Sequence, residues 1–238
     1  MTELKKKITE LNDRFGKADS KEILAYLASY SPGKVVFSTS FGVEDQVITE
    51  MLHAIIPPVS VFTLDTGRLF PETYDLLSAT RSKYGMDIRV IFPDFNQVEE
   101  MVNKKGINLF YDSFENRKLC CRVRKVIPLT RALRGVEFWI SGLRKDQSSG
   151  RSEISLFEWD EDHRLIRVHP LADWSTEKIW EYAMENKVPY NPLHDKGFSS
   201  IGCQPCTRAV LPGEDFRAGR WWWEPSGKKE CGIHQHNK

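Results

Sequence analysis

Hydrophobic residues recur along this chain in two alternating patterns, one with helical spacing and one typical of short buried strands. Helical spacing predicts helices over residues 2–15, 20–30, 43–55, 71–84, 96–104 and 117–134. Short apolar runs predict strands over residues 34–37, 59–64, 87–92 and 136–140. Strands that alternate with helices in this way predict a mainly parallel α/β sheet with helices on both faces.

The last third of the chain has a different pattern. Residues 154–159 and 165–168 predict two short strands, which we expect at the edge of the sheet, and residues 175–186 predict a helix. From Val188 onward, prolines and glycines interrupt the sequence, and few side chains there could form an independent core. Such a segment is typical of a chain that is held in place by a bound group.

The composition excludes few functions, but it indicates the compartment in which the protein acts. The chain of 238 residues has a formal net charge of +1, which gives no indication of nucleic-acid or membrane binding. No stretch approaches 18 uncharged apolar residues, and no apolar run follows the basic start, so we expect neither a membrane span nor a signal peptide. We therefore expect a cytoplasmic protein. In a reducing compartment, clustered cysteines bind metal or do redox chemistry more often than they form structural disulfides.

Small and polar residues follow the first two predicted strands. Ser38, Ser40 and Gly42 lie between a strand and a helix, where backbone N–H groups and the positive helix end can bind an anion. The turn lacks the G-x-x-x-x-G-K-[ST] signature, and an ordinary strand-to-helix turn explains it equally well. Asp65 and Arg68 follow the next strand, at the carboxyl edge where open α/β sheets bind ligands, although a helix cap would also explain Asp65.

The five cysteines divide into two close pairs and one single residue. Cys120 and Cys121 are adjacent, and Cys203 and Cys206 form a C-x-x-C. Two close pairs predict one four-thiolate site that ties the α/β part of the chain to its C-terminal section. Cys231 then remains available for chemistry.

Three states of this four-thiolate site are open. A single zinc ion needs sulfurs roughly 3.7 Å apart, which adjacent cysteines reach poorly. An iron–sulfur cubane is larger and holds its thiolates farther apart. Buried reduced cysteines need no metal, but they explain one pair more readily than two. The spacing favours the cluster, and the nearby cations of Arg122, Arg124 and Lys125 suit its negative charge.

Cys231 lies between two lysines and His234 in the sequence. Neighbouring cations stabilise a thiolate, which is the nucleophilic form of the side chain. The other interpretation is an inert thiol in a disordered tail. The three consecutive tryptophans at 221–223 are too apolar to trail in water, which favours a tail that docks on the protein.

Taken together, these motifs resemble the assimilatory adenylyl-sulfate reductases, the cluster-containing branch of the phosphoadenylyl-sulfate reductase family. The resemblance runs from about residue 34 to the end of the chain, and no motif position departs from the family pattern. The stretches that carry it are Ser38–Gly42, Leu64–Arg68, Pro71–Tyr74, Cys120–Lys125, Gly142–Gln147, Val168–Trp174, Tyr190–Leu193, Gly202–Thr207, Gly219–Trp223 and Lys229–His234.

The resemblance implies an adenine nucleotide α-hydrolase-like fold of the PP-loop, Rossmann-like kind. It implies a [4Fe-4S] cluster on Cys120, Cys121, Cys203 and Cys206, and Cys231 as the nucleophile. The implied substrate is adenosine 5′-phosphosulfate (APS), and the products are sulfite and AMP. The implied intermediate is an S-sulfocysteine on Cys231, which thioredoxin or glutaredoxin would reduce.

Anionic oxygens shield the sulfate sulfur from a thiolate, so we expect cations at the substrate in addition to the residues that follow the first two strands. The expected substrate-binding residues are Ser38, Ser40, Gly42, Asp65, Arg68, Lys125, Arg144, Arg151, Arg217 and Arg220. We expect one catalytic domain over residues 1–238, made of N-terminal helices (1–30), an α/β nucleotide-binding body (31–186), and a cluster-binding section with a mobile catalytic tail (187–238).

Three other functions are open. The first is reduction of the 3′-phosphorylated substrate (PAPS), alone or together with APS. The second is an ATP-dependent PP-loop thiolation enzyme, whose S-G-G-x-D-S loop Ser38–Gly42 does not match. The third is a zinc-stabilised binding module without catalysis.

Overall fold

A computed structural model describes residues 2–30, 32–147 and 151–224 of the chain. Its strands form one sheet in the order β3-β2-β1-β4-β6-β5. Their bounds are β1 Val35–Ser38, β2 Ser60–Leu64, β3 Ile88–Ile91, β4 Phe138–Ile140, β5 Phe157–Asp160 and β6 Leu165–Val168.

The sheet is mainly parallel, as the sequence predicts. β1 pairs in parallel with β2 and β4, with Val36 opposite Ser60 and Trp139, and β4 pairs in parallel with β6. β5 is antiparallel to β6 and lies at the edge of the sheet, where we expected the short C-terminal strands. The central strand β4 is buried on both faces, as its continuous run Phe-Trp-Ile requires.

The observed helices agree closely with those predicted from the helical spacing of hydrophobic residues. Their bounds are α1 Thr2–Phe15, α2 Ser20–Ala28, α3 Val43–His53, α4 Pro71–Tyr84, α5 Phe95–Lys105, α6 Phe114–Cys121, α7 Ile127–Ala132 and α8 Thr176–Glu185. No helix in the described ranges is long and apolar enough to cross a membrane.

The chain folds into two compact units that interleave in the sequence. The first contains residues 1–63, 72–89 and 135–192, and the second contains residues 64–71, 90–134 and the chain from 193 onward. Residues 90–134, which we expected in the α/β body, therefore group with the C-terminal section. The expectation of one catalytic domain over residues 1–238 stays a prediction.

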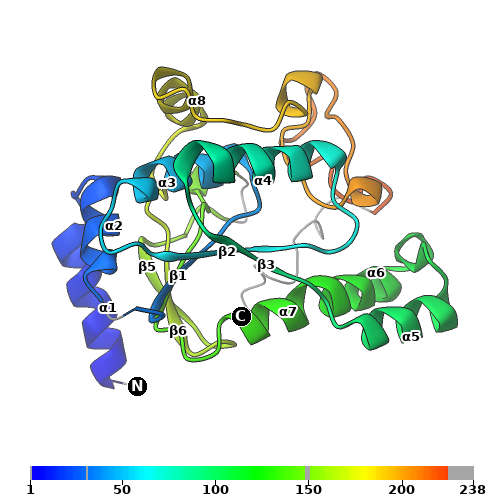
Figure 1. Ribbon diagram of the computed structural model, residues 1–238, viewed down its shortest axis with the longest axis horizontal. Coiled ribbons are helices and arrows are strands. Elements are labelled where there is room, and N and C mark those ends of the chain that lie inside the picture. The colour runs from blue at the N-terminus through cyan, green and yellow to red at the C-terminus, as the bar shows by residue number, and fades with distance from the viewer. Residues whose placement is uncertain (1, 31, 148–150, 225–238) are drawn as a thin grey trace. The chain divides into compact units, whose positions relative to one another are not determined.

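The first unit has a continuous apolar core that includes Leu24, Phe37, Phe138 and Phe157, each at most 1% exposed. Helices α1 and α2 lie side by side at its N-terminal end (Figure 1). The rings of Phe15 and Tyr26 contact each other at an angle of 42°, with centroids 4.7 Å apart. These helices complete the core and supply no polar group to the sites described below.

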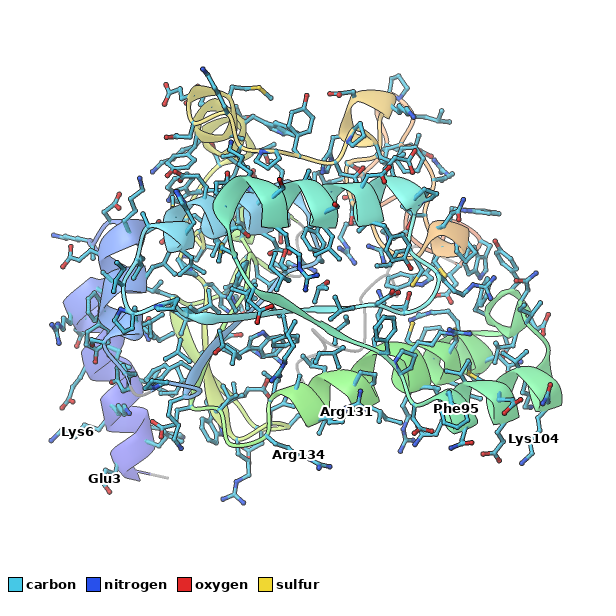
Figure 2. The ribbon with its side chains drawn as sticks, in the orientation of Figure 1. Glu3, Lys6, Phe95, Lys104, Arg131 and Arg134 are labelled. Atoms are coloured by element: carbon cyan, nitrogen blue, oxygen red, sulfur yellow. The ribbon has the colours of Figure 1, made fainter. Side chains whose placement is uncertain are left out.

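The second unit is built from α5, α6 and α7 together with the loop-rich C-terminal section. Its apolar core includes Met101, Leu109, Phe110 and Trp221, and the cysteines pack against it. Phe95 and Lys104 on α5 project outward from the ribbon (Figure 2), and Phe95 is 73% exposed.

One helix departs from its predicted form. We expected a single helix over 117–134 with a kink at Pro128, but the helix begins earlier, at Phe114, because the Ser113 side chain caps it by accepting from the Asn116 N–H. The helix then widens into a π-helical turn over Arg122–Val126, where the Ile127 N–H donates to the Arg122 carbonyl. Pro128 has no N–H to continue an α-helical pattern, which accounts for the position of the wide turn.

Candidate functional site

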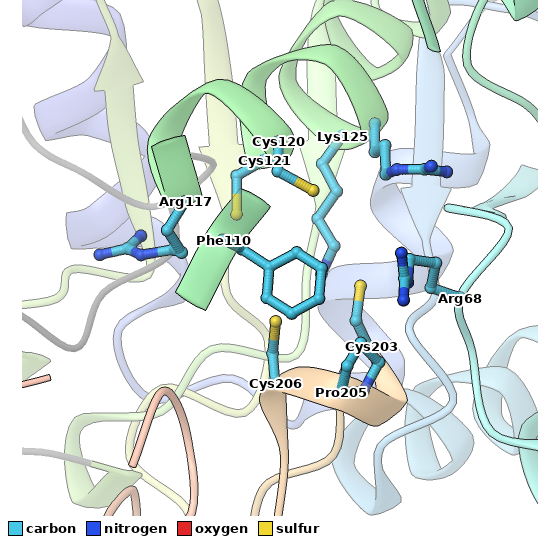
Figure 3. Close-up of a pocket in the computed structure, with 10 residues that line it drawn as sticks. Arg68, Phe110, Arg117, Cys120, Cys121, Lys125, Cys203, Pro205 and Cys206 are labelled. Atoms are coloured by element: carbon cyan, nitrogen blue, oxygen red, sulfur yellow. The ribbon is translucent and has the colours of Figure 1, made fainter. Parts of the chain in front are cut away.

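Four cysteines from two distant segments line one pocket of the second unit. Cys120 and Cys121 end α6, and Cys203 and Cys206 lie in and beside a 3₁₀ turn over Gln204–Cys206. The sulfur atoms of Cys203 and Cys206 point toward the helix that carries Cys120 and Cys121 (Figure 3). The structure therefore brings together the two pairs that the sequence assigned to one site.

All four cysteines of this pocket are free thiols, with no disulfide between them. Cys120 and Cys206 are 8% exposed. Among the described residues, no three Cys, His, Asp or Glu side chains already lie at the spacing of one bound metal ion. The assignment of a bound group to this pocket therefore depends on the kind of donors it contains and on their shared position.

Burial makes two of these thiols, Cys120 and Cys206, hard to ionise on their own. It raises the pKa of Cys206 to about 12, with a contribution from neighbouring Cys203. Burial also raises the pKa of Cys120, although the Arg124 guanidinium opposes that shift. A buried thiol becomes a thiolate when a metal takes the place of its proton. Four thiols that line one pocket together with cations form a donor set that fits an iron–sulfur cluster.

Cations and one aromatic ring complete the wall of this pocket. The lining residues besides the cysteines are Arg68, Phe110, Arg117, Arg124, Lys125 and Pro205. Arg117 hydrogen-bonds the Cys121 side chain, and Arg124 hydrogen-bonds the Cys120 side chain. Each arginine lies four residues from its cysteine, so the helix itself brings the two side chains together.

The loop after β2 supplies a hydroxyl to the cysteine site. Thr66 Oγ1 lies 3.2 Å from Cys203 Sγ, and the Thr66 carbonyl accepts a 2.6 Å hydrogen bond from Arg124. Asp65 shapes this loop, because its carboxylate accepts from the Gly67 N–H at 2.7 Å where Gly67 has φ +70°. The structure thus places Asp65 in a turn, and Thr66 brings its hydroxyl next to a cysteine.

Arg68 is held in place on three sides. Its guanidinium donates to the Ile107 carbonyl at 2.6 Å and to the Asn108 side chain at 2.9 Å. It also lies 5.0 Å from the centre of the Phe110 ring. The Arg68 carbonyl accepts from the Gln204 N–H, which ties this loop to the C-x-x-C turn.

The two predicted C-terminal arginines are largely buried. Arg217 and Arg220 are 8% and 6% exposed. Arg220 donates to Ser200 Oγ and to the Ile201 carbonyl, each at 3.3 Å, and its Nε has no hydrogen-bond partner among the described residues. A Cβ at Gly202 would lie 2.3 Å from an Arg220 nitrogen, which explains why glycine precedes the C-x-x-C.

In the first unit, the loop after β1 is closed by a carboxylate. Asp45 accepts from the Ser40 N–H at 2.6 Å and from the Ser40 hydroxyl at 2.7 Å. Ser38 Oγ accepts from the Trp139 indole at 2.7 Å. Gly42 caps α3 without a side-chain hydrogen bond. The structure therefore shows a strand–turn–helix arrangement at Ser38–Gly42, with Ser38 and Ser40 held by neighbouring side chains.

Arg144 is buried among protein acceptors of the same unit. It is 1% exposed and binds Glu44 Oε1 at 2.7 Å, the Trp174 carbonyl at 3.0 Å and Asp146 at 3.4 Å. Arg151 donates to Gln147, whose amide donates in turn to Glu44 at 2.9 Å. This network holds the loop after β4 against the start of α3.

Cys231, the predicted nucleophile, lies outside the described residues. Several other residues of these sites were not predicted from the sequence. Arg117 could have been found from the i, i+3, i+4, i+7 spacing of residues 117, 120, 121 and 124, which places them on one helix face. Thr66 and Asp45 gave no comparable signal, because their partners are distant in the sequence or defined only by the loop conformation.

The fold and the site together indicate a class of protein. A mainly parallel α/β sheet with a hydroxyl-bearing strand-to-helix turn is typical of nucleotide-binding proteins, and the four cysteines of one pocket are a donor set that suits a metal group. The chain belongs to the phosphoadenosine phosphosulfate reductase domain family, whose pattern it matches over residues 34–209.

Curated relatives extend the similarity to most of the chain. An adenosine 5′-phosphosulfate reductase of Agrobacterium fabrum is 50% identical over 202 residues, covering 85% of this chain and 78% of the relative. A protein of the same name from Sinorhizobium fredii (strain NBRC 101917 / NGR234) is 47% identical over 224 residues, covering 94% of this chain and 89% of the relative.

Solved structures agree on the fold. A phosphoadenylyl-sulfate reductase from Candida auris, crystallised as a phosphate complex, is 30% identical with a TM-score of 0.73, covering 85% of this chain and 96% of that one. An FMN adenylyltransferase of Candida glabrata, in complex with ATP, has a TM-score of 0.52 at 18% identity, covering 77% of this chain and 58% of that one. At that identity the second similarity concerns the fold alone.

Proposed function

We propose that this protein is an oxidoreductase of sulfate assimilation that reduces APS to sulfite and AMP. The observation that carries the proposal is the pocket where Cys120, Cys121, Cys203 and Cys206 meet a set of cations, in a chain about half identical to adenosine 5′-phosphosulfate reductases. Its cysteine usage suits a reducing compartment, so we propose that the protein acts in the cytoplasm.

The proposed reaction has two steps. The Cys231 thiolate attacks the sulfur of APS, the S–O bond to the 5′-phosphate breaks, and AMP leaves with the bonding electron pair. Cys231 then carries an S-sulfo group. A dithiol reductant such as thioredoxin or glutaredoxin attacks the Cys231 sulfur and releases sulfite. Its second thiol resolves the mixed disulfide, so the dithiol supplies the two electrons that sulfate sulfur gains.

We propose that the four pocket cysteines hold a [4Fe-4S] cluster. The cluster, when bound, supplies a compact charged centre that fixes the C-x-x-C turn and orients the surrounding cations. The residues already present support this assignment, since Arg117 and Arg124 can stabilise thiolates at Cys121 and Cys120, and Thr66 can do so at Cys203.

The remaining predicted residues take roles that suit their environments. Ser38, Ser40 and Gly42 are proposed to bind adenosine and the 5′-phosphate, and Lys125, Arg151, Arg217 and Arg220 to neutralise the sulfate. Asp65 and Arg68 are proposed to shape the substrate-binding loop after β2. Arg144 is proposed to act through the loop it holds, because its guanidinium already has several protein acceptors.

The test is sulfite release from APS and from PAPS, measured side by side with reduced thioredoxin. We expect turnover of APS, and we expect Cys231→Ser to abolish sulfite release while AMP binding and iron content stay unchanged. Normal turnover by Cys231→Ser would refute the nucleophile assignment. Exclusive turnover of PAPS would replace the substrate, and no sulfite from either nucleotide would refute the proposed function.

A further inference from the structure

Arg117 connects the cysteine site to the last described residue of the chain. Its Nε and Nη2 donate to the two carboxylate oxygens of Glu224, each at 2.8 Å, across 107 positions of sequence. The side chains of Arg117 and Glu224 are only 1% and 5% exposed. Arg117 also hydrogen-bonds the Cys121 side chain. One buried guanidinium therefore joins a predicted cluster ligand to the point where the C-terminal tail begins.

Aromatic rings fix the orientation of this guanidinium. Its carbon lies 4.8 Å from the centre of the Phe114 ring and 4.5 Å from the centre of the Trp221 ring. A planar guanidinium stacked in this way and paired with both oxygens of one carboxylate has a single well-defined position. Lysine could not reproduce both contacts.

The backbone before Glu224 is also held by its surroundings. Trp221 has φ +42°, in the left-handed region that bulky residues avoid. Its side chain is 1% exposed, its N–H donates to the Cys206 carbonyl at 3.1 Å, and its carbonyl accepts from the Glu224 N–H at 2.8 Å. Such a conformation persists when neighbouring contacts determine it. Residues 221–224 are thus attached both to the C-x-x-C turn and to α6.

We propose that the Arg117–Glu224 pair anchors the origin of the C-terminal tail beside the cysteine site, so that Cys231 is delivered to substrate from a fixed point. The proposal rests on the proposed role of Cys231 as nucleophile. Cys231 follows Glu224 by seven residues, so a fully extended chain carries its Cα at most about 25 Å from that of Glu224. Arg117 and Glu224 are positioning residues, because they act through the tail.

Breaking the Arg117–Glu224 pair should slow the delivery of Cys231 in two ways, which differ in magnitude. If only Glu224 came loose, the number of residues between the last anchored position and Cys231 would grow from seven to ten, counted from Trp221. Chain statistics alone would then slow delivery of Cys231 less than about twofold. A larger loss is expected because the buried Arg117 guanidinium would lose its carboxylate partner, and its contact with the Trp221 ring would be disturbed as well.

The test uses anaerobically purified full-length protein, mixed with APS without a reductant and quenched over time. Intact mass gives the rate at which one sulfonate is added to Cys231. We expect Glu224→Gln to slow this step about tenfold or more at saturating APS, with the half-saturating APS concentration and the iron content unchanged. Glu224→Asp, which keeps the charge, should recover part of the rate.

The matched control is Glu214→Gln. Glu214 also pairs with an arginine through both oxygens, at 2.7 and 2.8 Å from Arg208, but this pair is partly exposed and neither residue lines the cysteine pocket. We expect this variant to form the adduct at the wild-type rate. A change of less than twofold in Glu224→Gln would overturn the proposal, and so would a loss of iron that accounts for its slower rate.

A second measurement separates failure of the anchor from failure of the proposed function. If the wild-type protein forms no adduct, the role of Cys231 is refuted, and hydrogen exchange then decides about the anchor. We expect the amides of residues 221–224 to exchange faster in Glu224→Gln than in Glu214→Gln. Equal exchange in the two variants would overturn the anchor.

Discussion

The backbone of Gly142 touches the carboxylate of Asp45. A Cβ at position 142 would lie 2.4 Å from Asp45 Oδ1 and 3.2 Å from the Asp45 nitrogen. Asp45 also closes the loop after β1 through Ser40. The loops after β1 and β4 are therefore packed against each other through a position that has no room for a side chain.

Gly142→Ala should separate these two loops. We expect a loss of about 1–3 kcal/mol in the free energy of unfolding, as is typical of overpacking, and weaker AMP binding. Urea unfolding and a binding titration measure the two effects. Gly42→Ala is the control for stability, because Gly42 has φ −65° and a Cβ there would meet nothing closer than 3.6 Å. Equal stability of the two variants would contradict the close contact.

Asp45 should make stability fall as the pH rises. Burial raises its pKa to about 6, although hydrogen bonds from Ser40 oppose the shift. The unfolded chain loses this proton near pH 4 and the folded chain near pH 6, so stability declines between these values by about 2–3 kcal/mol. Asp45→Asn cannot ionise and should lack this decline. Urea unfolding of both proteins at pH 4, 5, 6 and 7 measures the difference, and parallel profiles would contradict the assignment.

Asp160 should act with the opposite sign. Burial opposes its ionisation, but a hydrogen bond with His163 and the charge of Arg167, 2.7 Å away, outweigh burial and hold its pKa at about 2. A lowered carboxyl pKa gives stability that is present above about pH 4 and is lost as the pH falls toward 2.

Asp160→Asn should therefore cost about 2 kcal/mol at neutral pH and almost nothing near pH 2. Thermal or urea unfolding of both proteins across this range measures the difference. Asp162→Asn, in the turn between β5 and β6, is the control for a charge change nearby. A constant difference between wild type and Asp160→Asn at every pH would contradict the ion pair as its cause.

Anaerobically purified protein should be brown and contain about four irons per chain, as a single cubane requires. Cys203→Ser should lower the iron and acid-labile sulfide contents, and Cys231→Ser should leave both unchanged. Elemental analysis and the visible spectrum measure this. Zinc as the sole metal would refute the cluster.

Local sequence patterns predict much of the secondary structure. α4 and β6 have the bounds that periodicity predicts, because a proline opens α4 and a short apolar run bounded by polar turns defines β6. The prediction of a single helix over 117–134 was wrong in detail, since the Ser113 cap and the π-helical turn depend on hydrogen bonds that hydrophobic periodicity does not reveal.

The cysteine site could be inferred because each of its segments has a recognisable sequence pattern. Two close cysteine pairs are rare enough to indicate a shared site, and the helical spacing of Arg117 and Arg124 from Cys121 and Cys120 follows from the chain alone. The sequence does not reveal which arginine is free to meet an anion. Arg144 looks like an anion ligand in the sequence, but folding surrounds it with Glu44 and carbonyl acceptors.

The sequence by itself determined the order of elements, the four thiols that share a pocket and the family to which the chain belongs. The tertiary structure alone decided the order of strands, the contact of Gly142 with Asp45 and the pairing of Arg117 with Glu224. The physical reason is the limited distance along the chain over which a sequence pattern reports contacts. Spacing along a helix or strand records neighbours within about two turns, whereas a buried ion pair across 107 positions exists only after the chain has packed.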